Sequence, residues 1–341
     1  MERLSLAGPT EVVMGSGLPK DLLPHRDDRA RVAILTQPAP TPLALGIASS
    51  LQSGGLSCEV IGLPDREEAK TLEVVASVYE ALGRFGLGRH DTIVGVGGGS
   101  VTDLAGYVAG TWLRGVEVVH VPTTLLGAVD AALGGKTGVN FGAKNLVGVI
   151  WHPSRVVIDI DQLATLPGFL TREGMAEAYK TALVGDGELA DLIRAEGLEA
   201  PLEEIISRSL RVKTTIVNQD MKEKGVRAFL NLGHTIGHSI EIASRLSHGE
   251  SIGLGIVAAA AISEKLVDFE SADEVKATIE MLGLPVRVDG LELARVLDLL
   301  EHDKKRDAGG LRMVLLEAIE KPILAHVDQV DVEFGLAAIG F

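Results

Sequence analysis

Short runs rich in β-branched residues recur through the first half of the chain, and this pattern constrains the fold more than any other feature. Each run predicts a strand. The runs are Arg31–Leu35, Cys58–Ile61, Thr92–Val96, Val116–Val121 and Val156–Ile160. Helical patterns separate several of them, for example at Leu72–Phe85 and Asp103–Trp112. Strands that alternate with helices predict a Rossmann-like parallel sheet in an α/β domain over residues 1–160.

The second half has a different pattern, because strand signals fade and amphipathic helices dominate over residues 161–341. The helical segments are Ala190–Glu196, Leu202–Asn218, Asn231–Leu246, Ser251–Val267 and Ala272–Leu282. A late apolar stretch, Leu311–Leu316, predicts one strand of a small hairpin ending against Pro322. A length of 341 residues suits two cores. We therefore expect a mostly α-helical second domain, with the ligand in a cleft between the two domains.

Charge and apolar pattern exclude several classes of function. The net charge of −15 and the lack of a basic run argue against nucleic acid and anionic membranes as partners. The N-terminus lacks the pattern of a secretory signal, and the apolar run near Ile252–Ile262 is shorter than the roughly 20 residues that span a bilayer. The single Cys58 fits a reducing compartment. We expect a cytoplasmic protein whose site must gather cations locally if its substrate is anionic.

A glycine-rich turn follows the strand that ends at Val96. Gly97, Gly98 and Gly99 precede a helix whose first amides favour a phosphate or pyrophosphate. The spacing departs from the dinucleotide fingerprint, because Ser100 stands where the last glycine is expected. Taken alone, the segment predicts either a nucleotide site or a tight turn between a strand and a helix.

Two lysines follow in what the pattern predicts to be a glycine-rich loop, Lys136 after Gly134-Gly135 and Lys144 before Asn145. Lysines in such loops act as point charges for phosphate. Asp130 could hold a substrate hydroxyl or orient a lysine. The alternative is that both lysines lie on the solvated surface.

A carboxylate and several imidazoles predict a metal site. Glu177 and Lys180 share one face of a helix expected to begin near Glu173. His234 and His238 stand four residues apart, so both could reach one centre, and His248 begins the next helix. One Glu with two or three His forms a divalent site with an open position. Spacing alone pairs His234 with His238 as ligands, and the alternative is that these histidines cap or pack helices.

Together these segments resemble the 3-dehydroquinate synthase family over residues 64–316. The motifs, in chain order, are GGGSVTD, VPTTLLGAVDAALGGKTGVN, KNLVG, GMAEAYK, NLGHTIGH, HGE and DKK. The resemblance implies an NAD-binding α/β domain and a helical domain that binds zinc or cobalt. It implies conversion of 3-deoxy-arabino-heptulosonate 7-phosphate to 3-dehydroquinate and phosphate in the shikimate pathway. Transient oxidation, elimination, reduction and aldol closure would leave NAD unconsumed.

The resemblance also assigns residues by motif position. It implies Glu177, His234 and His248 as metal ligands, leaving His238 to handle protons or contact the substrate. The implied NAD contacts are Asp65, Glu67, Lys70, Gly99, Ser100, Val101, Thr102, Asp103, Thr123, Thr124, Lys136, Lys144, Gln162, Leu163, Ala164 and Thr165. The implied substrate and catalytic residues are Asp130, Lys136, Lys144, Asn145, Lys180, Lys213, Arg227, Asn231, His238 and Lys304. Arg114 resembles an arginine that reaches the phosphate from a neighbouring subunit, which implies a homodimer.

Two positions depart from the family pattern. Gln37 follows Thr36 where an acidic residue is common, which bears on the adenosine contact, and Tyr179 replaces an aliphatic residue. The alternative functions are a polyol dehydrogenase such as glycerol dehydrogenase, a cyclase of secondary metabolism and an inactive binding protein. A neutral polyol needs no lysine set, and Arg227 with Asn231 favours a substrate with an acid group. The intact acid, histidine and lysine set disfavours an inactive protein.

Overall fold

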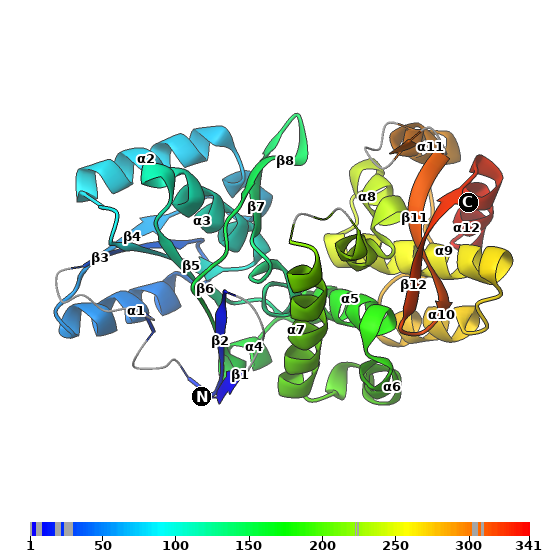
Figure 1. The fold of residues 1–341 in the computed structure, drawn as a ribbon, viewed down its shortest axis with the longest axis horizontal. Coiled ribbons are helices and arrows are strands. Elements are labelled where there is room, and N and C mark those ends of the chain that lie inside the picture. The colour runs from blue at the N-terminus through cyan, green and yellow to red at the C-terminus, as the bar shows by residue number, and fades with distance from the viewer. Residues whose placement is uncertain are drawn as a thin grey trace. The chain divides into compact units, whose positions relative to one another are not determined.

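The computed structural model describes residues 2–4, 9–17, 22–23, 30–221, 223, 225–301, 306–307 and 310–341. Lys304 lies outside the described residues. Contacts divide the chain into two compact units, Met1–Leu166 and Pro167–Phe341 (Figure 1). The boundary expected after residue 160 falls at the start of the short helix α4 (Ile160–Ala164). Within the described residues, no helix is both long and apolar enough to cross a membrane.

The N-terminal unit is built on a seven-stranded sheet with the order β1-β2-β9-β6-β5-β3-β4. The strands are β1 (Glu2–Leu4), β2 (Glu11–Gly15), β3 (Arg31–Thr36), β4 (Ser57–Gly62), β5 (Thr92–Gly97), β6 (Glu117–Pro122) and β9 (Arg155–Asp159). Neighbouring strands are parallel except β1 and β2. All five predicted strands are confirmed, and so is the α/β class.

Helices cover both faces of this sheet, as Figure 1 shows. Alternate residues of β3 pack in opposite directions: Ala33 and Leu35 join the core beneath α2 (Leu72–Phe85) and α3 (Gly99–Thr111). Val32 and Ile34 join the core beneath α1 (Thr41–Ser53). The central strands β3 and β5 are buried on both faces, so their sequences are nearly continuous apolar runs with no polar alternation.

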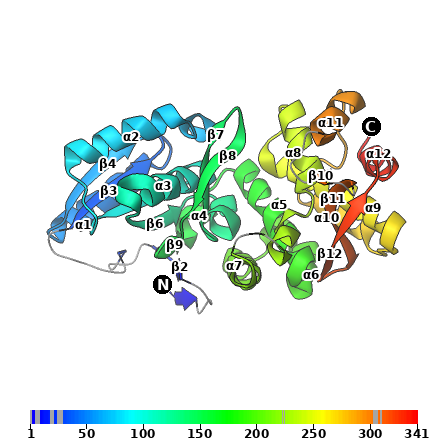
Figure 2. The same ribbon diagram turned by 45° about the horizontal axis from the view of Figure 1, so that its top comes forward.

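A separate hairpin consists of β7 (Lys136–Phe141) and β8 (Ala143–Ile150) (Figures 1 and 2). The predicted glycine-rich loop is therefore wrong for Lys136, Lys144 and Asn145, which lie in strands. Helix α3 packs closely against this hairpin: a Cβ atom on Gly106 would lie 2.3 Å from the Thr137 Cγ2 atom. Only glycine allows this approach.

The C-terminal unit is mostly helical, as predicted (Figure 2). Its helices are α5 (Gly168–Gly185), α6 (Gly187–Glu196), α7 (Leu202–Gln219), α8 (His234–Ala243), α9 (His248–Val267), α10 (Ala272–Met281), α11 (Leu293–Glu301) and α12 (Gln329–Ala338). The predicted hairpin is confirmed as β11 (Gly310–Ala318) and β12 (Lys321–Val327), with β10 (Arg306–Asp307) beside it.

Several helix starts differ from the predictions, among them α6, which begins at Gly187 and not at Ala190. Helix α5 begins at Gly168, so Glu173 lies inside it, and α3 begins at Gly99 and already contains Asp103. Helix α8 begins at His234, because Gly233 adopts a left-handed φ of 76°. The residues before that turn form a short 3-10 helix, η5 (Val226–Asn231).

Helices α8 and α9 contact each other through glycines. A Cβ atom on Gly255 of α9 would lie 1.9 Å from the carbonyl oxygen of Gly233, and one on Gly237 of α8 would lie 2.8 Å from the Ser251 carbonyl oxygen. The two backbones are therefore in near contact. This close approach brings together the first residues of α8 and α9, which are both histidines.

Candidate functional site

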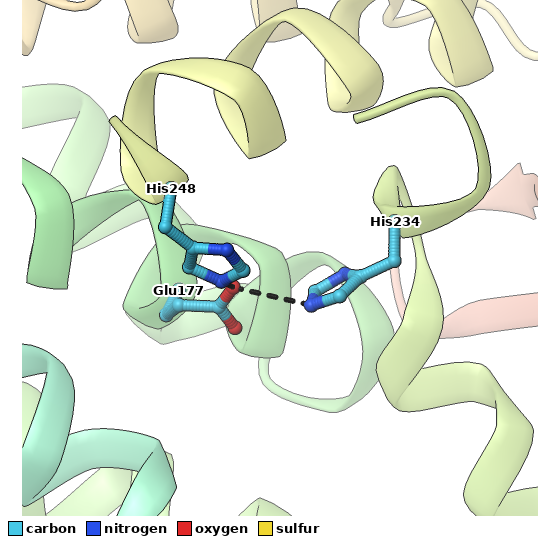
Figure 3. A group of neighbouring side chains, drawn as sticks. All are labelled: Glu177, His234 and His248. Carbon is cyan, nitrogen blue, oxygen red and sulfur yellow. Dashed lines mark ion pairs between the residues drawn. The ribbon is translucent and has the colours of Figure 1, made fainter. Parts of the chain in front are cut away.

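Three side chains from three helices of the C-terminal unit converge on one point (Figure 3). Glu177 lies in the middle of α5, whereas His234 and His248 are the first residues of α8 and α9. The Oε1 atom of Glu177 lies 3.4 Å from the Nε2 atom of each histidine. The three ligand atoms all lie within 4.8 Å of one another. This donor set can hold a divalent cation.

The second nitrogen of each imidazole faces an acceptor. His234 Nδ1 lies 3.1 Å from the Leu232 carbonyl oxygen, and His248 Nδ1 lies 3.3 Å from Glu241 Oε2. A hydrogen on Nδ1 leaves the Nε2 lone pair for a cation, and the acceptor also fixes the ring orientation. Neither a motif nor the resemblance pointed to Glu241. Its only sequence signal is a position three residues after His238, on the same face of α8.

Charge around Glu177 favours the ionised ligand. Burial raises the pKa of its carboxyl, but Lys180, His234 and His248 outweigh burial and hold the pKa well below its usual range. Lys180 donates to Glu177 Oε2, and both side chains are buried. Glu177 Oε1 has no hydrogen bond of normal length within the described residues. A buried carboxylate oxygen without such a hydrogen bond still has a lone pair that a cation can use.

The two histidines differ in protonation. Burial lowers the pKa of His234 well below its usual value, so its ring is neutral. Burial also lowers the pKa of His248, but the nearby carboxylates of Glu177 and Glu241 raise it to about 10. A cation that binds here replaces the proton of His248, as cations do at histidine ligands.

His238 stands beside this group. Its ring centroid lies 5.1 Å from that of His234 and 6.0 Å from that of His248. The group that contains Glu177 does not include His238, which instead lies within 4.8 Å of Glu241 and His248. The pairing of His234 with His238 expected from spacing alone is therefore not the arrangement around Glu177.

Other predicted residues of this unit are held by local contacts. Lys213 and Arg227 are buried, and Arg227 Nη1 donates to the Met221 carbonyl oxygen at 2.9 Å. Asn231 Nδ2 donates to Glu223 Oε1 at 2.8 Å. No motif in the sequence marks Glu223. Tyr179 is also buried, which raises the pKa of its phenol to about 12 and is consistent with a packing role.

In the N-terminal unit, a second polar cluster gathers residues predicted to face NAD. The buried Lys70 donates to Asp103 Oδ2 at 2.6 Å and also to Asn145 Oδ1. Burial raises the pKa of Asp103, although Lys70 acts in the opposite direction. Glu67 accepts from Ser100 Oγ at 3.4 Å. The 3-10 turn η1 (Arg66–Ala69) and the following Lys70 are therefore linked to α3 by two hydrogen bonds, Ser100 to Glu67 and Lys70 to Asp103.

The predicted glycine turn lies where β5 and β6 end. Thr123 N donates to the Gly97 carbonyl oxygen at 3.0 Å, and a Cβ atom on Gly98 would lie 3.1 Å from Thr124 Cγ2. The side chains of Val101 and Thr102 are buried, so only their backbone can face a ligand. Carboxyl ends of adjacent parallel strands are the usual ligand edge of such sheets.

The remaining predicted residues differ in how far they are exposed to solvent. Lys136, Lys144, Arg114 and Asp65 are exposed, and Asp130 is half-buried in the π-helical turn η3 (Gly127–Ala131). In the segment Gln162–Thr165 only Leu163 is buried. Gln37 donates to the carbonyl oxygens of Pro64 and Arg66 at 2.9 and 2.8 Å, so it anchors the segment that leads to Glu67.

Solved structures place the chain in a class of sugar-phosphate cyclases. It is similar to 2-deoxy-scyllo-inosose synthase in complex with carbaglucose-6-phosphate, NAD+ and Co2+, at 25% identity, 99% coverage of both chains and a TM-score of 0.87. It is also similar to 2-epi-5-epi-valiolone synthase from Streptomyces hygroscopicus with NAD+ and Zn2+, at 27% identity, 99% and 98% coverage and a TM-score of 0.88. Glycerol dehydrogenase from Schizosaccharomyces pombe, at 14% identity and a TM-score of 0.67, shares the fold alone; the match covers 99% of this chain and 90% of that one.

Sequence comparison then identifies the family. The family model of the 3-dehydroquinate synthase N-terminal region matches residues 60–173, and that of the C-terminal region matches residues 174–306. A 3-dehydroquinate synthase from Mycolicibacterium vanbaalenii is 44% identical, and one from Mycobacterium leprae is 43% identical. Both matches cover 92% of this chain and 90% of the relative. The chain belongs to the 3-dehydroquinate synthase family.

Proposed function

We propose that the chain converts 3-deoxy-D-arabino-heptulosonate 7-phosphate into 3-dehydroquinate and phosphate. NAD would accept a hydride from a ring carbinol and return it later, and the ketone present in between would make the neighbouring proton acidic enough for phosphate to leave by elimination. Ring opening with an intramolecular aldol reaction would then form the carbocycle. The observation that carries this proposal is the convergence of Glu177, His234 and His248 in a chain of this family.

Glu177, His234 and His248 would hold a divalent cation, zinc or cobalt, which supplies Lewis acidity and lowers the pKa of a coordinated hydroxyl. The ionised Glu177 and the neutral His234 are already in the protonation states that ligands need. The two cyclases described above were solved with Co2+ and with Zn2+, which supports the same choice of cation.

Cationic and amide side chains would bind and orient the sugar acid. Lys180 is fixed by Glu177, and Lys213 and Arg227 present buried positive charge suited to a carboxylate or phosphate. Asn231 and Asp130 would hold hydroxyls, and His238, next to both liganding histidines, would move a proton. Lys136, Lys144, Asn145 and Lys304 complete the set assigned by motif position. This local positive charge offsets the acidic character of the whole chain.

The carboxyl edge of the sheet in the N-terminal unit would bind NAD. A Cβ atom on Gly97 or Gly98 would meet the side chain of Val101 or Thr124, so these glycines keep the turn tight, and the first amides of α3 would face the pyrophosphate. The polar cluster of Glu67, Lys70, Ser100 and Asp103 lies at the same helix start. NAD contacts from Thr123, Thr124 and the segment 162–165 are part of the same proposal.

We further propose a homodimer in which Arg114 reaches the substrate phosphate of the partner. The exposed Arg114 follows Leu113, and both adopt left-handed φ values of 68° and 50°. Such strained backbone conformations are often found at functional positions. The cytoplasm is the proposed compartment, in keeping with the single free Cys58.

Phosphate release tests the proposed reaction. Purified protein with zinc and catalytic NAD should release phosphate from the heptulosonate phosphate without net NADH. Two parallel reactions should contain glucose 6-phosphate and a heptulose 7-phosphate that lacks the carboxylate. Release from only these two substrates, which carry a phosphate but no carboxylate, would redirect the assignment to another cyclase. Stoichiometric NADH would instead indicate a dehydrogenase.

A further inference from the structure

The hairpin of β7 and β8 contains an irregularity at Asn140. Val139 pairs with Val147 and Phe141 pairs with Ala143, so Asn140 alone stands opposite residues 144–146 of β8. Those residues form a bulge, and Asn145 within it adopts a left-handed φ of 53°. Bulges interrupt the ladder of hydrogen bonds and often aim side chains at a functional site.

The side chain of Asn140 replaces part of the interrupted ladder. Its Oδ1 atom accepts from the Asn145 backbone amide at 2.9 Å, and its Nδ2 atom donates to Glu67 Oε2 at 2.9 Å. These two partners fix the orientation of the amide, since an N–H needs an acceptor and a carboxylate needs a donor. The Asn140 backbone amide also donates to the Lys70 carbonyl oxygen at 2.8 Å.

Lys70 closes this set of contacts into a ring. Its ammonium donates to Asn145 Oδ1 and to Asp103 Oδ2, while Glu67 accepts from Ser100. The bulge, the turn η1 and the start of α3 are therefore tied together by hydrogen bonds within one unit. Asn140 is the residue that bonds both the bulge and Glu67.

We propose that Asn140 is a positioning residue that couples the binding of NAD to the binding of substrate. The inference rests on the proposed function, in which Asn145 and Lys144 contact substrate and Glu67 and Lys70 contact NAD. Asn140 holds Glu67 and the bulge in one arrangement, so a ligand that orders either partner also orders the other. Such coupling is reciprocal, and each ligand raises the affinity for the other by the same factor.

Two variants of Asn140 test this coupling. Asn140→Ala removes both side-chain bonds, whereas Asn140→Asp keeps the acceptor for Asn145 but places a second carboxylate against Glu67. The control is Gln52→Ala, an exposed amide on α1 that bonds the Cys58 carbonyl oxygen. The dissociation constant of NAD should be measured by calorimetry with and without a phosphonate analogue of the substrate.

In wild type the analogue should tighten NAD binding. The coupling factor, which is the ratio of the NAD dissociation constants without and with the analogue, should fall toward one in Asn140→Ala. The dissociation constant of NAD should rise about tenfold, the usual effect of losing one or two hydrogen bonds. Asn140→Asp should weaken NAD binding as much as Asn140→Ala does, but it should raise the KM for substrate less. In a Glu67→Gln background, Asn140→Ala should change NAD affinity less than it does alone, because the two residues act through one contact.

The outcomes separate this inference from the proposed function. Suppose that wild type binds NAD and releases phosphate. If both Asn140 variants then show the wild-type coupling factor and differ only in a lower melting temperature, Asn140 merely stabilises the hairpin. That result would overturn the inference. If wild type neither binds NAD nor releases phosphate, the proposed function falls together with the inference. Asn140→Asp is almost isosteric, so it provides a folded variant if Asn140→Ala is poorly stable.

Discussion

Glu241 Oε2 lies 3.3 Å from Nδ1 of His248, and Nε2 of the same ring lies 3.4 Å from Glu177 Oε1. The imidazole of His248 is therefore held between two carboxylates, one of which belongs to the ligand group. The side chain of Glu241 is only 9% exposed. Glu241 fixes the ring in the orientation that a cation needs.

We expect Glu241→Gln to weaken metal binding by roughly 10- to 100-fold, the usual range for such orienting partners. Competition with a coloured chelator measures this affinity without reference to turnover. Glu264→Gln, at an exposed position of the same helix as His248, is the matched control. Unchanged zinc affinity in Glu241→Gln would show that His248 needs no orienting carboxylate.

Glu177→Gln should abolish stoichiometric metal binding and leave a folded but less stable protein. The substitution leaves the buried ammonium of Lys180 without its anionic partner, and breaking a buried pair in this way costs about 3 kcal/mol or more. Metal content and urea unfolding of the metal-free protein measure the two effects. Asp191→Asn, which removes an exposed partner of Arg194, should change neither. Wild-type metal content in Glu177→Gln would rule out the ligand role.

The glycine contact between α8 and α9 predicts an unusual sensitivity to one methyl group. Gly255→Ala would place a Cβ atom 1.9 Å from the Gly233 carbonyl oxygen, so the helices must separate. We expect a loss of about 3 kcal/mol in the free energy of unfolding and weaker metal binding. Gly46→Ala on α1, where no atom lies within 4 Å, should leave stability unchanged or raise it by about 0.5–1 kcal/mol. Equal stability of the two variants would contradict the near contact.

His120 predicts a pH dependence of stability. Burial in the N-terminal unit lowers its pKa from 6.5 to about 3. Between these values the unfolded chain binds a proton that the folded protein does not. The free energy of unfolding therefore falls by about 1.4 kcal/mol for each unit that the pH drops through this window. His120→Gln should remove that part of the slope in urea unfolding between pH 6.5 and 4.5, and the exposed control His90→Gln should keep it. An unchanged slope in His120→Gln would contradict a neutral, buried ring.

Arg114→Ala and Lys180→Ala should complement each other if each site takes Arg114 from the partner. Each variant alone should be inactive. Mixed and refolded together, they should regain part of the wild-type phosphate release, because some dimers then contain one complete site. Activity that stays absent although mixed dimers are detected by mass spectrometry would place Arg114 outside the neighbouring site.

The sequence predicts well those elements whose ends carry local signals. Helix α2 has its predicted bounds because Thr71 caps its first turn and Gly86 ends it with a left-handed φ of 76°. The glycines around Lys136 predict a loop where the structure has the hairpin of β7 and β8, in which Gly138 and Gly148 pair. Those glycines are required by the pairing: a Cβ atom on Gly148 would lie 2.4 Å from the Thr137 carbonyl oxygen. Only the three-dimensional contact distinguishes such a strand glycine from a loop glycine.

The same distinction applies to the site. Family motifs pointed to Glu177, His234 and His248, and the structure brings these three together. Spacing alone would have paired His234 with His238, because an interval of four residues reports only a shared helix face. The sequence does not predict a role for Glu241 or Asn140, since each acts on a residue that lies far away in the sequence or on another element. Such roles are visible only after folding.

All three side chains proposed as metal ligands, and both acceptors that face their imidazoles, belong to residues 167–341. The hydrogen-bonded ring around Asn140 belongs entirely to residues 1–166. We therefore expect the metal ion and NAD to bind in either order. A titration of NAD into the metal-free protein, or of the metal into protein without NAD, should fit a single-site binding isotherm.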